Sequence, residues 1–183
     1  TGAVCFATAA DLLNEGLDLR VDERNFYRLE VSGTLSRLTD VDTQPLREAG
    51  LLGVSADGTL LAFAAMDPSL PGARPIRPYA LHPADGIAVP LTPDDVGSMT
   101  IDGWLSPVGG RLVLRAGADY TGMNGSRLNQ IFRVDTSSGN IEQLTEVQTP
   151  GASHPVIDGS GNLAAFETTA SILINETSGT SRV

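Results

Sequence analysis

The chain has 183 residues, and its 12 basic and 22 acidic side chains give a formal net charge of −10. This acidity disfavours nucleic acid and anionic lipid as partners, because like charges repel. The sequence also lacks the run of about eighteen apolar residues that a membrane-spanning helix needs. Twenty glycines, eleven prolines and only 5% aromatic residues favour a turn-rich, all-β protein.

A repeat runs along the sequence. The dipeptide Leu-Thr occurs three times at intervals of 53 residues, beginning at Leu38, Leu91 and Leu144. The residues before each copy predict a strand, a turn and a second strand, over 26–39, 77–92 and 130–145. The turn glycines keep the same spacing, as expected where a hairpin needs a positive φ: Gly33, Gly86 and Gly139.

A second hairpin precedes the later copies, over 53–63, 104–114 and 156–166. Ser55, Ser106 and Asp158 open its turn, where a short side-chain acceptor can bind the backbone ahead, and Gly58, Gly109 and Gly161 end it. The runs that follow are almost wholly apolar, in 60–63, 112–114 and 163–166. Such runs predict strands that neighbouring sheets cover on both faces.

Each repeat of 51 to 53 residues therefore contains four antiparallel strands, the content of one β-propeller blade. We expect an all-β protein of about four blades, with a partial blade in 1–40 and fuller blades at about 51–92, 100–145 and 153–183. The partial blade lacks its innermost strand, and an unpaired ladder edge invites strand addition. We therefore expect the chain to be part of a larger propeller, or to self-associate through its terminal blades, at 4–10 or 180–183.

The sequences of the two hairpins resemble the repeat of TolB-like β-propellers, and the resemblance covers nearly the whole chain. The resemblance is carried by Ser55-Ala-Asp-Gly58 with Ala62-Phe63, by Trp104-Leu-Ser-Pro107, and by Gln130-Ile-Phe132 with Gln143-Leu-Thr145. Val108 in place of the turn aspartate and Asp158-Gly-Ser-Gly161 depart from the pattern. The resemblance implies a non-catalytic recognition or assembly module that works in the periplasm or outside the cell.

Connections in an antiparallel blade alternate between two faces, so the long connections share one face and the tight turns share the other. Long loops on a rigid scaffold are the usual place for binding. We therefore predict that a protein or peptide partner binds the long-loop face, which carries Asp11, Asp18, Asp22, Asp40, Asp42, Asp67, Asp94 and Asp95.

One long loop also has the oxygen-bearing side chains that a Ca²⁺ ion prefers, at Asp119, Asn124, Ser126 and Asn129. The same residue types are common in solvated turns, and the spacing of a calcium-binding loop is absent. A Ca²⁺ site and a plain loop both stay open, and no other cofactor is predicted.

The sequence does not predict an enzyme, because it lacks a Gly-x-Ser-x-Gly nucleophile motif. Ser106 is interpreted as a turn residue, Trp104 and Cys5 as core residues, and His82 and His154 as surface or packing residues. Two alternatives are the propeller of a prolyl-oligopeptidase-like hydrolase, with its catalytic domain elsewhere, and a structural repeat of a cell-surface or filament protein.

Overall fold

The computed structural model describes residues 2–17, 23–39, 47–71, 75–94, 102–147, 152–168 and 172–173. These residues form strands, turns and loops without any helix, which confirms the predicted all-β class. No helix in this described part could span a membrane.

Three sheets of antiparallel strands follow one another along the sequence, each with its strands in sequence order. Blade 1 contains β1 (Ala3–Thr8), β2 (Asn25–Glu30) and β3 (Leu35–Arg37). Blade 2 contains β4 (Arg47–Val54), β5 (Leu61–Met66), β6 (Ile76–Leu81) and β7 (Ala88–Pro90). Blade 3 contains β8 (Asp102–Leu105), β9 (Arg111–Ala116), β10 (Gln130–Asp135) and β11 (Ile141–Gln143).

Blade 4 is described only through β13 (Ala152–Ile157) and β14 (Ala164–Thr168), which pair with each other. The sequence places Ile172 in the third strand of this blade. In the structure β15 (Ile172–Leu173) instead pairs with β12 (Glu146–Val147), a short strand that the sequence did not predict. The rest of the expected strand, and the predicted edge at 180–183, lie outside the described residues.

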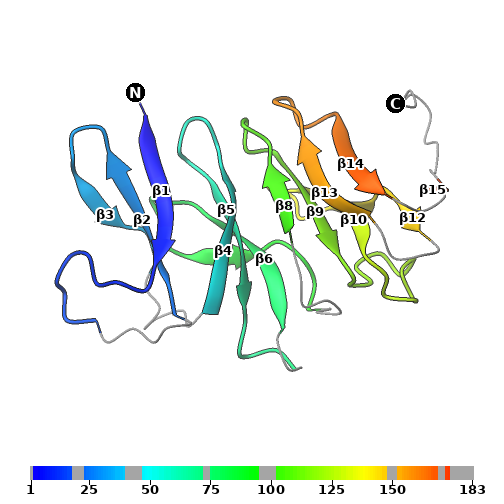
Figure 1. Ribbon diagram of the computed structural model, residues 1–183, viewed down its shortest axis with the longest axis horizontal. Helices are drawn as coiled ribbons and strands as arrows, with labels where there is room; N and C mark the ends of the chain where they lie inside the picture. Colours follow the sequence, from blue (N-terminus) through cyan, green and yellow to red (C-terminus); the bar gives the residue numbers. More distant parts are fainter. Residues whose placement is uncertain are drawn as a thin grey trace.

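The blades stand side by side in sequence order, and their connections separate onto two faces (Figure 1). The tight turns β2–β3, β4–β5, β8–β9 and β13–β14 lie at the top of Figure 1 and form the turn face. The longer connections β1–β2, β5–β6 and β9–β10 lie at the bottom and form the loop face. This is the predicted segregation of turns from loops.

The second strand is buried on both faces in blades 2 and 3, as the apolar runs predict. The same prediction was wrong for the run 163–166 of blade 4, where Leu163 is 58% exposed and the residues of β14 alternate between partly buried and exposed. In β5, Leu61 and Phe63 pack with Phe26 of blade 1, whereas Ala62 and Ala64 pack into a core shared with blade 3. Adjacent residues of a strand point to opposite faces, so one strand contributes to two cores. Each buried leucine or phenylalanine contributes about 1.5–3 kcal/mol to folding.

Strand β9 has the same arrangement one blade further along. Leu112 and Leu114 face the core shared with blade 2, and Val113 packs with Ala152 and Ile157 of blade 4. The cores of this protein therefore lie between blades, so each blade is stabilised by its neighbours.

The predicted turn chemistry is present in all three hairpins. The N–H of Leu60 donates to Ser55 Oγ over 2.9 Å, and the N–H of Arg111 donates to Ser106 Oγ over 3.2 Å. In blade 4 the N–H of Leu163 donates to Asp158 Oδ1 over 3.0 Å. The closing glycines have φ values of 71°, 76° and 78°, at Gly58, Gly109 and Gly161.

Two carboxylates make these turns sensitive to acid. A hydrogen bond from the Ser55 hydroxyl, followed by bonds from Thr59, lowers the pKa of Asp57 to about 2. Bonds from the Leu163 N–H and the Ser160 hydroxyl lower the pKa of Asp158 to about 2. A depressed carboxyl pKa gives stability that is present above the unfolded value of 3.8 and is lost as the pH falls toward 2.

The turn face also joins neighbouring blades. The N–H of Ala56 in blade 2 donates to the carbonyl of Pro107 in blade 3 over 2.7 Å. A Cβ at Gly109 would lie 3.2 Å from Ser55 Cβ, and one at Gly161 would lie 2.7 Å from Arg111 Cγ. The glycine that ends each turn thus lets that turn pack closely against the preceding blade.

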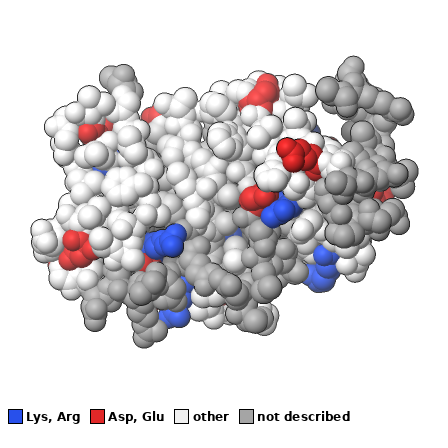
Figure 2. Space-filling view, in the orientation of Figure 1, with Lys and Arg blue, Asp and Glu red and all other residues white. Residues whose placement is uncertain are grey.

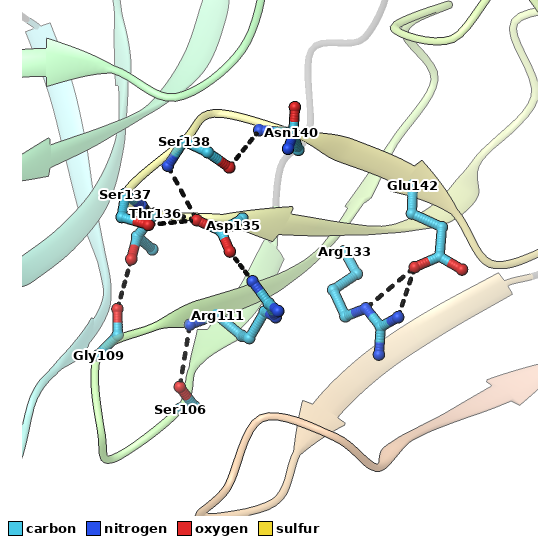
Figure 3. A network of polar contacts seen from close by, with 10 residues as sticks. All are labelled: Ser106, Gly109, Arg111, Arg133, Asp135, Thr136, Ser137, Ser138, Asn140 and Glu142. Carbon is cyan, nitrogen blue, oxygen red and sulfur yellow. Dashed lines mark hydrogen bonds and ion pairs between the residues drawn. The ribbon is translucent and has the colours of Figure 1, made fainter.

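Within blade 3, polar side chains link the two hairpin turns (Figure 3). The Thr136 hydroxyl donates to the Gly109 carbonyl over 2.6 Å, and Arg111 forms an ion pair with Asp135. Asp135 Oδ1 also accepts bonds from Ser137 and Ser138. These contacts stabilise the two turns of blade 3 against each other.

Trp104 was predicted to be a core residue, and this prediction was wrong because its side chain is 54% exposed. Trp104 lies on β8, the strand at one edge of its sheet, where no described strand pairs along the other side. Cys5 is partly buried against the core between blades 1 and 2, and burial raises the pKa of its thiol.

We expect Gly161→Ala to destabilise the protein more than Gly139→Ala does. Both glycines have a positive φ, so both variants gain backbone strain of about 1–3 kcal/mol. Only the new Cβ at position 161 meets a neighbouring blade, whereas the space around Gly139 is open. Urea unfolding of the two variants measures the difference, and equal losses would contradict close packing between the turns.

Candidate functional site

The structure describes three of the eight aspartates that the sequence placed on the loop face: Asp11, Asp67 and Asp94. The other five lie outside the described residues: Asp18, Asp22, Asp40, Asp42 and Asp95.

Asp11 begins the β1–β2 connection and binds the backbone of its own loop. Its carboxylate accepts the N–H groups of Glu15, Gly16 and Leu17 at 3.1, 2.8 and 3.1 Å. These hydrogen bonds, that from Glu15 first, lower the pKa of Asp11. The carboxylate therefore stabilises the loop conformation.

Asp119 occupies the same repeat position in the β9–β10 connection. Its Oδ1 accepts the N–H of Asn124 over 2.7 Å. The Asn124 side chain is in turn buried, and its Nδ2 donates to the carbonyls of Ala118 and Leu128 at 2.9 and 2.8 Å. Ser126 is exposed and Asn129 is partly buried. Of the four predicted Ca²⁺ ligands, Asp119 is thus engaged with the loop backbone, whereas Asn124 Oδ1, the atom of that side chain that could bind an ion, is buried without a hydrogen-bond partner.

The described residues contain no group of three or more His, Cys, Asp or Glu side chains that could hold a metal. Three of the four predicted Ca²⁺ ligands are Asn or Ser side chains and do not belong to these residue types, so the Ca²⁺ site stays a prediction. The two histidines have separate contacts: His82 Nδ1 lies 3.0 Å from the Thr59 carbonyl and His154 Nδ1 lies 3.2 Å from Glu167.

The threonine of the Leu-Thr dipeptide fastens the outer strand on the loop face of blades 1 and 3. Thr39 Oγ1 accepts the N–H of Phe26 over 2.9 Å and donates to Asn25 Oδ1 over 3.2 Å. Thr145 Oγ1 likewise accepts the N–H of Ile131 over 2.9 Å and donates to Gln130 Oε1 over 2.8 Å. We call this pair of bonds the threonine latch.

Blade 2 lacks this latch although it keeps the threonine. Arg77 replaces the asparagine or glutamine, and the next residue is Pro78, which has no N–H to donate. Thr92 Oγ1 is buried and has no hydrogen-bond partner. The guanidinium of Arg77 instead donates through Nη2 to the Thr92 carbonyl and through Nη1 to Asp94 over 2.7 Å.

Tyr79 brings Asp67 into the same region. Its hydroxyl donates to Asp67 Oδ2 over 2.8 Å, and its ring centre lies 5.8 Å from the Arg77 guanidinium carbon. Burial and the bond to Asp67 raise the pKa of Tyr79. Partial burial acts to raise the pKa of Asp67, but bonds from Ser69 and Tyr79 outweigh it and leave the pKa lowered.

Two predicted loop-face residues, Asp67 and Asp94, are thus joined by three residues that the sequence analysis missed. We call Asp67, Arg77, Tyr79, Thr92 and Asp94 the blade-2 cluster. The sequence contains a signal for this cluster. Arg77-Pro78 stands where blade 1 has Asn25-Phe26 and blade 3 has Gln130-Ile131.

Comparison with known proteins identifies the fold. No family model matches the sequence, and no curated protein matches it significantly. Among solved structures, a putative TolB from Agrobacterium tumefaciens matches with a TM-score of 0.59 and 17% identity, over 90% of this chain and 49% of that one. TolB from Acinetobacter baumannii matches with a TM-score of 0.52 and 19% identity, over 79% of this chain and 32% of that one.

The protein therefore has a TolB-like β-propeller fold, and it spans about half and about a third of the length of these two proteins.

Chelation distinguishes a Ca²⁺ site from a plain loop between Asp119 and Asn129. Because hydrogen bonds to Asp119 Oδ1 and from Asn124 Nδ2 hold this loop without an ion, we expect excess EDTA to leave the melting temperature unchanged. A bound ion would stabilise the folded state by mass action. A melting temperature that falls with EDTA and recovers with added Ca²⁺ would establish the site.

Proposed function

We propose that the protein is a non-catalytic recognition module that binds a protein partner through its loop face. The observation that carries this proposal is the blade-2 cluster. Tyr79 holds the carboxylate of Asp67, and the buried guanidinium of Arg77 lies against the Tyr79 ring, on the face that is not used for packing the hairpin turns. Polar groups held in place before binding lose less entropy when a partner arrives.

A partner with a basic surface fits this face best. All twelve basic residues of the sequence are arginines, and seven of them form ion pairs within the described residues: Arg28, Arg37, Arg47, Arg77, Arg111, Arg115 and Arg133. Figure 2 views the blades from the side, with the loop face at the lower edge, and in this view the basic side chains are separate spots that form no continuous patch. Opposite charge on a partner would speed association and favour the correct orientation.

Two wider features support the same proposal. The chain spans 49% and 32% of the two TolB proteins, which supports the proposal that its blades belong to a larger propeller or associate with other copies. The TolB-like fold also supports a periplasmic or extracellular location.

The loop face can be tested with a C-terminally amidated hexa-arginine peptide. In an NMR titration, we expect shifts at 9–17, 67–71 and 117–129 on the loop face, with little change at the turns 55–58 and 106–110. Binding should weaken about two- to fivefold in Asp67→Asn, because one carboxylate charge is lost.

The matched control is Asp85→Asn, which removes the same charge from the exposed β6–β7 turn of the same blade. We expect this variant to bind the peptide like the parent protein. Shifts centred on the turn face, or equal weakening in both variants, would contradict the proposal.

A further inference from the structure

The blade-2 cluster departs from a hydrogen-bonding pattern that blades 1 and 3 share. There, the latch joins a threonine hydroxyl to a neutral amide. In blade 2 a guanidinium takes that place, with its residue only 5% exposed, and leaves Arg77 Nε and Thr92 Oγ1 buried without partners. Burying a charge and unpaired polar atoms opposes folding. Such local departures are expected at functional sites.

The donor groups of Arg77 and Thr92 indicate which kind of ligand could bind here. Every N–H of the Arg77 guanidinium, including the Nη1 group that Asp94 contacts, is a donor, and the Thr92 hydroxyl can donate as well, so the group that this site takes is a hydrogen-bond acceptor. A planar guanidinium matches a carboxylate, which can accept two parallel N–H bonds. The protein already places one carboxylate, that of Asp94, against Arg77 Nη1 at 2.7 Å.

The two members of this ion pair differ in how firmly they are held. The Arg77 side chain is 7% exposed, whereas that of Asp94 is 78% exposed. Moving Asp94 into water therefore costs little, because most of its side chain is already hydrated. Removing Arg77 from its site would instead disrupt the packing of the guanidinium against Tyr79 and its bond to the Thr92 carbonyl.

We propose that Arg77 is a binding site for a carboxylate of the partner, and that Asp94 is an internal substitute which this carboxylate displaces. The inference rests on the proposed binding at the loop face and names one contact within it. The exchange leaves one carboxylate in contact with the guanidinium, and the displaced Asp94 carboxylate is hydrated. Repulsion from the distant acidic residues is screened beyond about 8 Å at physiological salt. The carboxylate belongs either to the C-terminus of a polypeptide or to an Asp or Glu side chain.

Small carboxylates test Arg77 independently of the peptide experiment. N-acetylglycine mimics a C-terminal carboxylate, N-acetylaspartate α-amide mimics an acidic side chain, and N-acetylglycinamide is the neutral control. We expect at least one acid, and not the amide, to shift the Nε–H resonance of Arg77. Asp94→Ala should bind that acid about tenfold more tightly, the gain expected if Arg77 of the parent protein is free of Asp94 for about one tenth of the time.

The acid that responds identifies the source of the carboxylate. The proposal is overturned if neither acid binds Asp94→Ala more tightly than the parent protein, or if Arg77→Gln in the Asp94→Ala background retains the binding. Binding of hexa-arginine at the loop face is a separate result, so failure of that function and failure of this site are distinguishable.

A stability measurement separates this role from a structural one. The double variant Arg77→Gln, Pro78→Ile restores the residue types that form the latch in blade 3, with an amide and an N–H for Thr92. We expect it to lose acid binding while its melting temperature stays equal or rises. A markedly lower melting temperature would show that Arg77 is needed for folding, and would overturn the proposal.

Discussion

The burial of β5 and β9 on both faces is the constraint on which the rest of this structure depends. Phe63 and Ala64 are neighbours in the sequence, yet they pack into cores on opposite sides of blade 2. Val113 and Leu114 do the same in blade 3. Because these cores lie between sheets, one blade alone would expose its second strand to water. Stability in such a repeat is therefore largely a property of the contacts between neighbouring units.

The two ends of the blades differ in how closely neighbouring blades pack. At the turn face, Gly109 and Gly161 allow successive turns to pack closely, so a larger side chain at either position would meet the preceding blade. On the loop face, the space around Gly16, Gly122 and Gly125 is open. There Asp11 and Asp119 stabilise their own loops, and blade 2 replaces the threonine latch with Arg77 and its two aspartates. The departure from the repeat thus occurs where packing tolerates it.

Residues that repeat at fixed spacing allowed the sequence to predict the hairpins, the turn glycines and the strands buried on both faces. The spacing of Leu-Thr located Thr39 and Thr145, but their hydrogen-bond partners come from another strand and required the structure. Arg77 was missed because a charged residue in a strand gives no sign of burial. Trp104 was misplaced because hydrophobicity does not reveal an edge strand. The two-residue strands β12 and β15 are too short to show periodicity.

Native-state hydrogen exchange tests the central claim, that the blades share their cores, most directly. If they do, the amides of β5 and β9 exchange only through global unfolding and report the same free energy, while those of the outer strands β3, β7 and β11 exchange sooner. The account would be contradicted if β5 exchanged through an opening that left β9 protected, because blade 2 would then unfold without its neighbour.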